Sequence, residues 1–172
     1  MNKKKLKYRV TYLEMNRKPS FDWPKNLKHK LSILLAKSFP TWYFLFFYKQ
    51  VGKNYYWTDW LRKSEDEIDE FVNDKNVLLY TLIKDGWPVG FYMLDYRKKD
   101  ICDLSFFGLV DEVIGIGLGK YLLQTAILTA WDSKKIKKLT VNTCSLDHKS
   151  AIYLYQKYGF TPVKYKDLEK TV

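Results

Sequence analysis

The sequence is poor in cysteine, with only Cys102 and Cys144 among 172 residues. Both lie in apolar segments that resemble strands, where a reduced, buried thiol is more typical than a disulfide. This indicates a reducing environment, and we expect a cytoplasmic protein. A chain of this length buries about two thirds of its unfolded surface, so its fold is expected to need no metal ion or disulfide.

Long apolar runs are absent as well. No window approaches the ~20 apolar residues of a membrane span, and no apolar stretch follows the lysines of MNKKKLKYRV as in a secretory signal. The sequence has no internal repeats, low-complexity tracts or Pro/Gly linkers. We expect one soluble domain over residues 1–172, a monomer or homodimer without a membrane partner.

Positive charge is abundant instead. The net charge is +11, and residues 1–30 carry ten Lys or Arg against only Glu14 and Asp22. Such a surface can attract nucleic acid, anionic lipid or a polyphosphate cofactor, or simply keep the protein soluble. Because no RNP-like, helix-turn-helix or zinc pattern accompanies the lysines, specific binding of nucleic acid is not expected.

The first half of the chain shows three segments with regular patterns. Residues 7–15 alternate like a strand, and residues 27–52 predict a helix that Pro40 breaks or kinks and Gly52 ends. Ser64 and Glu67 form a capping-box pattern, which predicts a short amphipathic helix from that point.

The second half predicts most of a sheet. Residues 76–84, 88–97 and 100–110 resemble strands, with Asp85-Gly86 as a hairpin turn between the first two, which predicts an antiparallel meander. A helix after Gly119, a strand at 137–146, a helix ended by Gly159 and a strand at 161–165 follow. The strand–helix–strand unit of residues 101–144 predicts a parallel pair in a mostly antiparallel sheet.

Three glycines at alternate positions, Gly115, Gly117 and Gly119, precede the clearest apolar helix pattern. A tight turn into the helix explains one glycine well and three poorly. Their N–H groups, uncovered by side chains at a helix N-terminus, form an array that suits phosphate oxygens. The G-x-G-x-G spacing matches neither a Walker A loop nor a dinucleotide fingerprint. We therefore predict a pyrophosphate site of another type.

The order of four motifs carries a resemblance. FFGLV, IGIGLGKYLL, LTVNTCSLDH and AIYLYQKYGF together resemble the acetyl-CoA-binding core of the GNAT N-acetyltransferase superfamily, over residues 76–162. The third and fourth motifs are similar to a bacterial subgroup of small GNAT proteins. The resemblance implies an α/β fold of the α+β type. Its central sheet is mixed and mostly antiparallel, with helices on both faces and a splayed parallel strand pair that holds acetyl-CoA.

The resemblance also implies the residues that bind the cofactor. Backbone N–H groups of one loop would wrap the pyrophosphate, and the end of the preceding strand would pair with the pantetheine arm. Ile114 stands where the family motif begins with Arg or Gln, and His148 stands where many relatives have a cofactor-touching Asn. A solvated or helix-capping His148 is the alternative. The implied cofactor-binding residues are Gly108, Leu109, Val110, Gly115, Ile116, Gly117, Leu118, Gly119, Lys120 and His148.

Acetyl transfer to an amine needs an oxyanion donor, an acid for the thiolate and a path for the amine proton. The resemblance places the acid at Tyr155 and the oxyanion donor on the backbone near Leu109, whereas a core aromatic is the alternative for Tyr155. Asp103 is the candidate base, and Glu112 a weaker one. Pairing of Asp103 with Lys98 or Lys99 is the structural alternative.

The implied function is transfer of an acetyl group from acetyl-CoA to a primary amine of a small molecule or peptide. The amine attacks directly in a ternary complex, without a metal. Aromatic residues around 42–60, with Asp59, either cradle the acceptor or serve only as core and lid. A CoA-binding regulator without catalysis and a basic nucleic-acid-binding module are the alternative functions.

Overall fold

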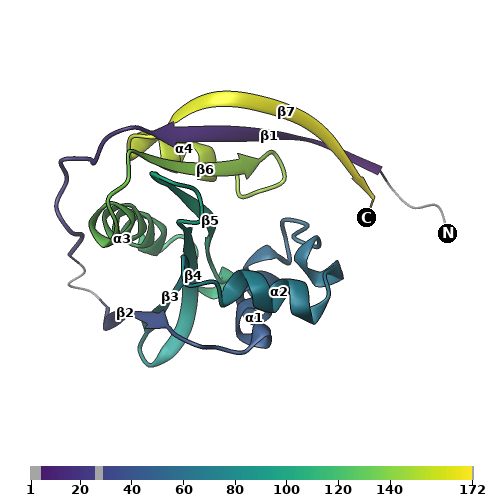
Figure 1. The fold of residues 1–172 in the computed structure, drawn as a ribbon, viewed down its shortest axis with the longest axis horizontal. Coiled ribbons are helices and arrows are strands. Elements are labelled where there is room, and N and C mark those ends of the chain that lie inside the picture. Colours follow the sequence, from purple (N-terminus) through teal and green to yellow (C-terminus); the bar gives the residue numbers. More distant parts are fainter. Residues whose placement is uncertain (1–4, 26–28, 172) are drawn as a thin grey trace.

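A computed structural model describes residues 5–25 and 29–171, which form one seven-stranded sheet with helices on both sides (Figure 1). The strands are β1 (Lys5–Met15), β2 (Leu31–Ala36), β3 (Val77–Lys84), β4 (Trp87–Asp95), β5 (Ile101–Leu109), β6 (Lys138–Cys144) and β7 (Thr161–Thr171). The helices are α1 (Thr41–Gly52), α2 (Glu65–Val72), α3 (Leu118–Ser133) and α4 (Ala151–Lys157), with 3₁₀ turns η1 (Trp60–Arg62) and η2 (Asp111–Val113). Across the sheet the order is β2-β3-β4-β5-β6-β1-β7.

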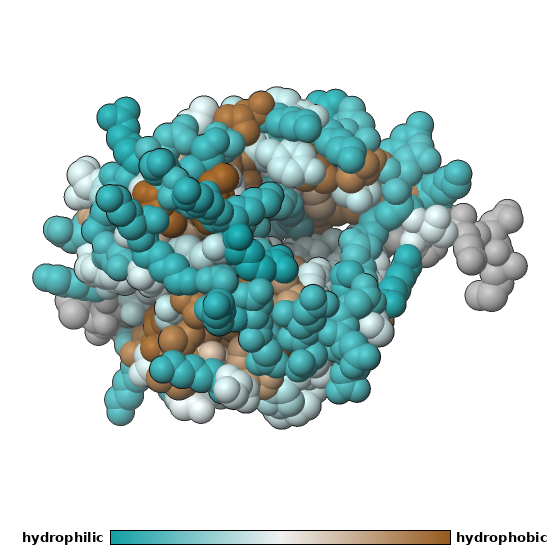
Figure 2. All heavy atoms as spheres, viewed as in Figure 1, coloured by the Kyte–Doolittle hydropathy of each residue, from teal (hydrophilic) through white to brown (hydrophobic). Residues whose placement is uncertain are grey.

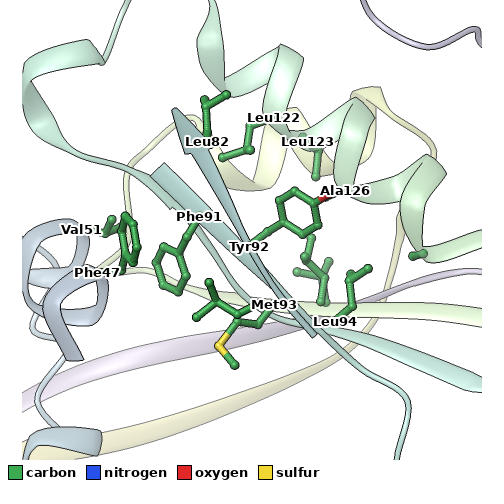
Figure 3. Packing of buried hydrophobic residues seen from close by; sticks show 14 of the residues in the cluster. Phe47, Val51, Leu82, Phe91, Tyr92, Met93, Leu94, Leu122, Leu123 and Ala126 are labelled. Carbon is green, nitrogen blue, oxygen red and sulfur yellow. The ribbon is translucent and has the colours of Figure 1, made fainter. Parts of the chain in front are cut away.

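Neighbouring residues of β4 show how the core is divided. Phe91 stacks on Phe47 of α1 with ring centroids 5.0 Å apart, whereas the hydroxyl of Tyr92 lies 3.1 Å from Thr129 Oγ1 of α3. Successive side chains of a strand point to opposite faces, so α1 and α3 cover opposite sides of the sheet. Figure 3 shows Phe91 beside Phe47 and Tyr92 directed toward Ala126 of α3. The predicted layers are therefore confirmed.

The predicted meander and parallel pair are confirmed too. Strands β3, β4 and β5 are antiparallel, and Asp85 and Gly86 both have positive φ, as a tight hairpin turn requires. Strands β5 and β6 are parallel, with α3 between them in the chain. Cys102 and Cys144 are free thiols, as predicted.

The helix predicted over residues 27–52 is only partly correct. Residues 27 and 28 lie outside the described residues, Leu31–Ala36 forms β2, and α1 begins at Thr41 after Pro40. A short apolar run reads equally well as strand or buried helix, and here the free edge of β3 provides a hydrogen-bonding partner. The proline disfavours helix at the residue before it, so the two segments separate.

Strand β1 lies between β6 and β7, on the far side of the sheet from β2. Its inner half, Val10–Met15, pairs with β6, and its outer half, Lys5–Arg9, pairs with β7 alone. The two strands form a ribbon that extends past β6 (Figure 1). Strand β7 runs to Thr171 instead of ending near 165 as predicted, because β1 supplies a partner along this length.

The capping box at the start of α2 generates a stability prediction. Ser64 Oγ accepts from the Glu67 N–H at 3.3 Å, and Glu67 Oε2 accepts from the Ser64 N–H at 3.0 Å. Ser64→Ala should lower the free energy of unfolding by about 1 kcal/mol in urea titrations. Ser32→Ala on the exposed side of β2 is the control and should change it by less than about 0.5 kcal/mol. Equal values for the two variants would contradict a stabilising cap.

Candidate active site

The backbone pairing between β5 and β6 stops early and leaves a cleft. Only Ile101–Asp103 pairs with Lys138–Thr140, and beyond these residues the two strands separate. The cleft has a volume of about 560 Å³. Figure 2 shows the molecule hollowed near the middle of the face in view, between β6 and α2 of Figure 1. The cleft is lined by Leu104–Leu109 of β5, by Asn142 and Thr143 of β6, and by residues of α4. The loop Gly115–Lys120, which we call the glycine loop, also lines it, as do Val51, Tyr55 and Trp57.

At two of the three alternating glycines, the backbone adopts a positive φ that favours glycine. Gly115 and Gly117 both have φ of +89°, and a Cβ at either would meet nothing within 4 Å. Gly119 is helical, and its Cβ would come no nearer than 3.9 Å to Leu109 and Leu154. A turn therefore explains Gly115 and Gly117, whereas neither φ nor crowding explains Gly119.

Helix α3 begins at this loop with an uncovered N-terminus. Gly117 is its N-cap residue and makes no side-chain capping bond, and the first turn holds no acidic residue. The first N–H groups of a helix have no partner within it and carry the positive end of the helix dipole. Because the loop lines the cleft, these donors are available to an anionic group bound there.

The structure brings most of the predicted site residues to one cleft. Its lining includes Gly108, Leu109, Gly115, Gly117, Gly119, Lys120, His148 and Tyr155. Four predicted residues are not part of it: Val110, Ile116, Leu118 and Asp103. Val110 and Leu118 are buried in the core, and Ile116 is 49% exposed. Ile114, at the departure from the family motif, does line the cleft.

The backbone N–H groups of Gly108, Leu109 and Val110, the three predicted positions at the end of β5, do not all point to the cleft. The Val110 N–H donates to the Val89 carbonyl at 2.9 Å. Because partners alternate along an antiparallel pair, the N–H of Gly108 also points to β4, and those of Leu109 and Phe107 point to the cleft. Leu109 thus keeps a donor in the cleft, whereas the N–H groups of Gly108 and Val110 are directed to β4.

Close packing against α1 explains why position 108 is a glycine. A Cβ at this position would lie 2.2 Å from Cγ1 of Val51, so the C-terminal end of α1 rests directly on the β5 backbone. The glycine lets the helix approach one wall of the cleft closely.

Tyr155 of α4 is a buried phenol at the cleft. Its residue is 6% exposed, and its ring has edge contacts with Phe107 and Phe160. Burial raises the pKa of Tyr155 above its ordinary 10.0, and the charge of Asp147 raises it further. Within the described part of the chain no group hydrogen-bonds its hydroxyl. The phenol therefore stays protonated at neutral pH and keeps a free donor.

Asp103 sits at the last paired position of β5, beside the cleft but not on its surface. Its carboxylate accepts from Thr140 Oγ1 at 2.5 Å and from Ser105 Oγ at 2.8 Å. Among the described residues it has no ion pair with Lys98 or Lys99, so that alternative is wrong. Ser105 lines the cleft and connects Asp103 to it.

His148 lies just before α4 and beside the cleft. Its Nδ1 accepts from the Ser150 N–H at 3.2 Å, at the start of α4, and its ring has an edge contact with Tyr55. It also lines the cleft.

The aromatic residues near α1 do not form the cation cradle considered above. Trp42 and Phe46 are 64% and 38% exposed and lie outside the cleft. Trp60 packs on Phe71, with centroids 4.6 Å apart, and Asp59 pairs with Lys170. The cleft takes other residues from this region, Tyr55 and Trp57.

Asp147 is a cleft residue to which the sequence alone assigned no function. Its carboxylate accepts from Trp57 Nε1 at 3.1 Å, Thr143 Oγ1 at 2.8 Å and the Cys144 N–H at 2.8 Å. Its place in the SLDH run before His148 was the available signal. Thr143 and Cys144 belong to the neighbouring end of β6, whereas Trp57 is 90 residues away in the chain, and only the fold brings it to Asp147.

The described residues contain neither a metal-binding cluster nor a membrane-spanning helix. Over residues 5–25 and 29–171, no three His, Cys, Asp or Glu side chains gather in a way that could hold a metal ion. Within the same ranges, no helix has the length and apolar character to cross a membrane.

Solved structures share this fold. A functionally unknown conserved protein from Staphylococcus epidermidis has TM-score 0.65 and 13% identity over 96% of this chain. A GCN5-related N-acetyltransferase from Kribbella flavida has TM-score 0.63 and 13% identity over 95% of it. This chain spans only 62% and 57% of those two proteins. A GNAT family acetyltransferase from Elizabethkingia anophelis, with acetyl-CoA bound, has TM-score 0.57 and 23% identity over 78% of each chain.

Sequence comparison decides the family. No curated protein matches the chain significantly. The profile of the acetyltransferase (GNAT) family matches residues 37–160, which include the glycine loop, both walls of the cleft and Tyr155. The splayed strand pair, the uncovered helix N-terminus and this match agree, and the protein belongs to the acetyltransferase (GNAT) family.

Proposed function

We propose that the protein transfers an acetyl group from acetyl-CoA to a primary amine of a small molecule or peptide. The observation that carries the proposal is the cleft between β5 and β6, with the uncovered N-terminus of α3 in its lining. The relative from Elizabethkingia anophelis was crystallised with acetyl-CoA bound, which supports the choice of donor. One domain over residues 1–172 would contain all the groups required.

The cleft suits the two chemically distinct parts of acetyl-CoA. The loop Gly115–Lys120 offers backbone donors and a lysine to the pyrophosphate, with no Cβ at Gly115 or Gly117 to block its approach. The Phe107 N–H points into the cleft, where a carbonyl of the pantetheine arm can accept from it, and the Leu109 N–H points into the same cleft. Ile114 gives an apolar contact where the family motif has Arg or Gln.

The chain's residues divide the chemistry of transfer among them. The amine nitrogen attacks the thioester carbonyl, the new C–N bond forms, the C–S bond breaks, and the thiolate leaves. The Leu109 N–H stabilises the oxyanion, and Tyr155 donates its proton to the thiolate. Ser105 takes the amine proton toward Asp103, whose carboxylate it already contacts.

A CoA-binding regulator is the main alternative, and it binds the same ligand without turnover. Release of CoA, followed with a thiol reagent over a panel of primary amines, distinguishes the two. A basic nucleic-acid-binding module is less well supported, because Lys7 and Arg9 are paired with Glu169 and Asp167 on the ribbon.

Binding of acetyl-CoA can be tested with two matched glycines. Gly117 and Gly86 both have φ near +90° and open space at Cβ, but only Gly117 lies in the cleft. Acetyl-CoA at 100 times its dissociation constant should raise the unfolding free energy of the wild type by about 2.7 kcal/mol. Gly117→Ala should lose most of this gain, whereas Gly86→Ala should keep it despite a similar loss of intrinsic stability. No stabilisation of the wild type by millimolar acetyl-CoA would overturn the proposal.

The assignment of Tyr155 predicts a kinetic effect. Tyr155→Phe keeps the ring and its contacts, so acetyl-CoA should bind almost normally. Loss of a positioned acid should lower the single-turnover rate by about a hundredfold to ten-thousandfold with any accepted amine. Tyr158→Phe, on a residue outside the cleft lining, is the control. A Tyr155→Phe rate within about threefold of the wild type would assign the proton to water.

The raised pKa of Tyr155 also predicts how stability depends on pH. Its phenol ionises near pH 10 in the unfolded chain but only at higher pH in the folded protein. The stabilisation is therefore complete below pH 10 and declines as pH rises further, by up to about 1.4 kcal/mol per pH unit. Tyr155→Phe should show a correspondingly shallower decline in urea unfolding between pH 9 and about 11. Tyr153→Phe, at an exposed position, should follow the wild type. Identical slopes for all three proteins would refute the assigned shift.

A further inference from the structure

The two walls of the cleft have no backbone pairing to each other beyond Asp103 and Thr140 in the described chain. A cleft that must fit one extended ligand still needs a defined width. Side chains of residues 53–57, between α1 and η1, contact both walls, and we call these residues the bridging segment.

The first contact is with the wall formed by β5. Asp111 lies just after that strand, in η2, and its Oδ2 accepts from Asn54 Nδ2 at 2.7 Å. Lys53 Nζ lies 3.1 Å from the same oxygen. One carboxylate therefore holds the start of the bridging segment to the first wall.

The second contact is with the wall formed by β6. Asp147 Oδ1 accepts from Trp57 Nε1 at 3.1 Å, at the other end of the bridging segment. Its Oδ2 accepts from Thr143 Oγ1 and from the Cys144 N–H, both at 2.8 Å. One oxygen thus binds the bridging segment, and the other binds the end of β6.

Close packing fixes the position of Trp57, so its hydrogen bond to Asp147 can connect the bridging segment to β6. A Cβ at Gly52 would lie 2.2 Å from the Trp57 Cβ, so the tryptophan lies tightly against the end of α1. Its ring also contacts Tyr48 and Phe106, with centroids 5.4 and 6.0 Å away. The indole N–H is the group that extends this packing to the opposite wall.

We propose that Asp147 is a positioning residue for acetyl transfer, which ties the bridging segment to β6 through Trp57 and thereby fixes the width of the cleft. The inference rests on the proposed function, because that function assigns the cleft to acetyl-CoA. Asp147 acts through Trp57, and Tyr155 and Ser105 remain the groups placed at the reacting atoms.

The chemistry of the side chain at position 147 allows a selective variant. Asn in place of Asp147 has one acceptor oxygen, which can keep the bonds to Thr143 and Cys144. Its amide NH₂ then faces the Trp57 N–H, and two donors do not bond. Asp147→Asn should therefore break the bridge and leave the end of β6 intact.

A double-mutant cycle tests the hydrogen bond between Asp147 and Trp57. The quantity measured is the dissociation constant for acetyl-CoA, by calorimetry. Asp147→Asn and Trp57→Phe should each raise the dissociation constant about tenfold, the order expected for loss of a charge-assisted hydrogen bond. The double variant should differ from either single variant by less than about twofold, because both changes remove the same contact. Asp66→Asn, on the exposed surface of α2, is the matched control and should bind like the wild type. Additive effects, or wild-type affinity in both single variants, would overturn the inference.

Trypsin tests the bridge without any ligand, so its result is independent of the proposed function. Lys53 lies at the start of the bridging segment, and release of Trp57 should expose the bond after it. Cleavage after Lys53 should be at least about tenfold faster in Asp147→Asn and in Trp57→Phe than in wild type and Asp66→Asn. Equal rates in all four folded proteins would overturn the bridge. If Asp147→Asn fails to fold by circular dichroism, Trp57→Phe still decides, because it breaks the same bond from the other end.

Discussion

The loss of backbone pairing between β5 and β6 is the constraint on which the site depends. Two strands in the interior of a sheet separate after three residue pairs, which leaves N–H and C=O groups without a neighbouring strand. Unpaired backbone groups that are shielded from water cost free energy. A ligand with its own amide groups can satisfy them, as an added strand would. The unpaired backbone groups of the cleft are therefore suited to an extended molecule that carries amide groups.

Close contacts at two glycines join the helical layer of α1 to this cleft. The end of α1 rests on β5 at Gly108, and Trp57 lies against Gly52 at the end of the same helix. A side chain at either glycine would push the helix or the tryptophan away from the cleft. These contacts hold the end of α1 and Trp57 against the β5 wall of the cleft.

The net charge of +11 hides two different arrangements of charged residues, one on the β1–β7 ribbon and one around the cleft. Several basic residues near the N-terminus lie on the β1–β7 ribbon, where Arg9 forms a bidentate pair with Asp167. Around the cleft, Asp103, Asp111 and Asp147 all accept hydrogen bonds, and each holds segments that are far apart in the sequence. Lysines line the same cleft at Lys120 and Lys157. The acids there organise the walls, and the lysines favour an anionic ligand.

The sequence alone determined the elements whose signals are local. Turn and cap residues such as Asp85-Gly86 and Ser64 fix backbone geometry within a few positions, and the motifs from FFGLV to YQKYGF identified the family and the cleft. Tertiary structure decided what depends on a partner. Residues 31–36 became a strand because the edge of β3 was free, and β1 found its place only between β6 and β7. Asp147 accepts from Trp57, which is 90 residues away in the chain. Spacing along the sequence carries no information about such contacts, because they exist only once the core has brought the two walls together.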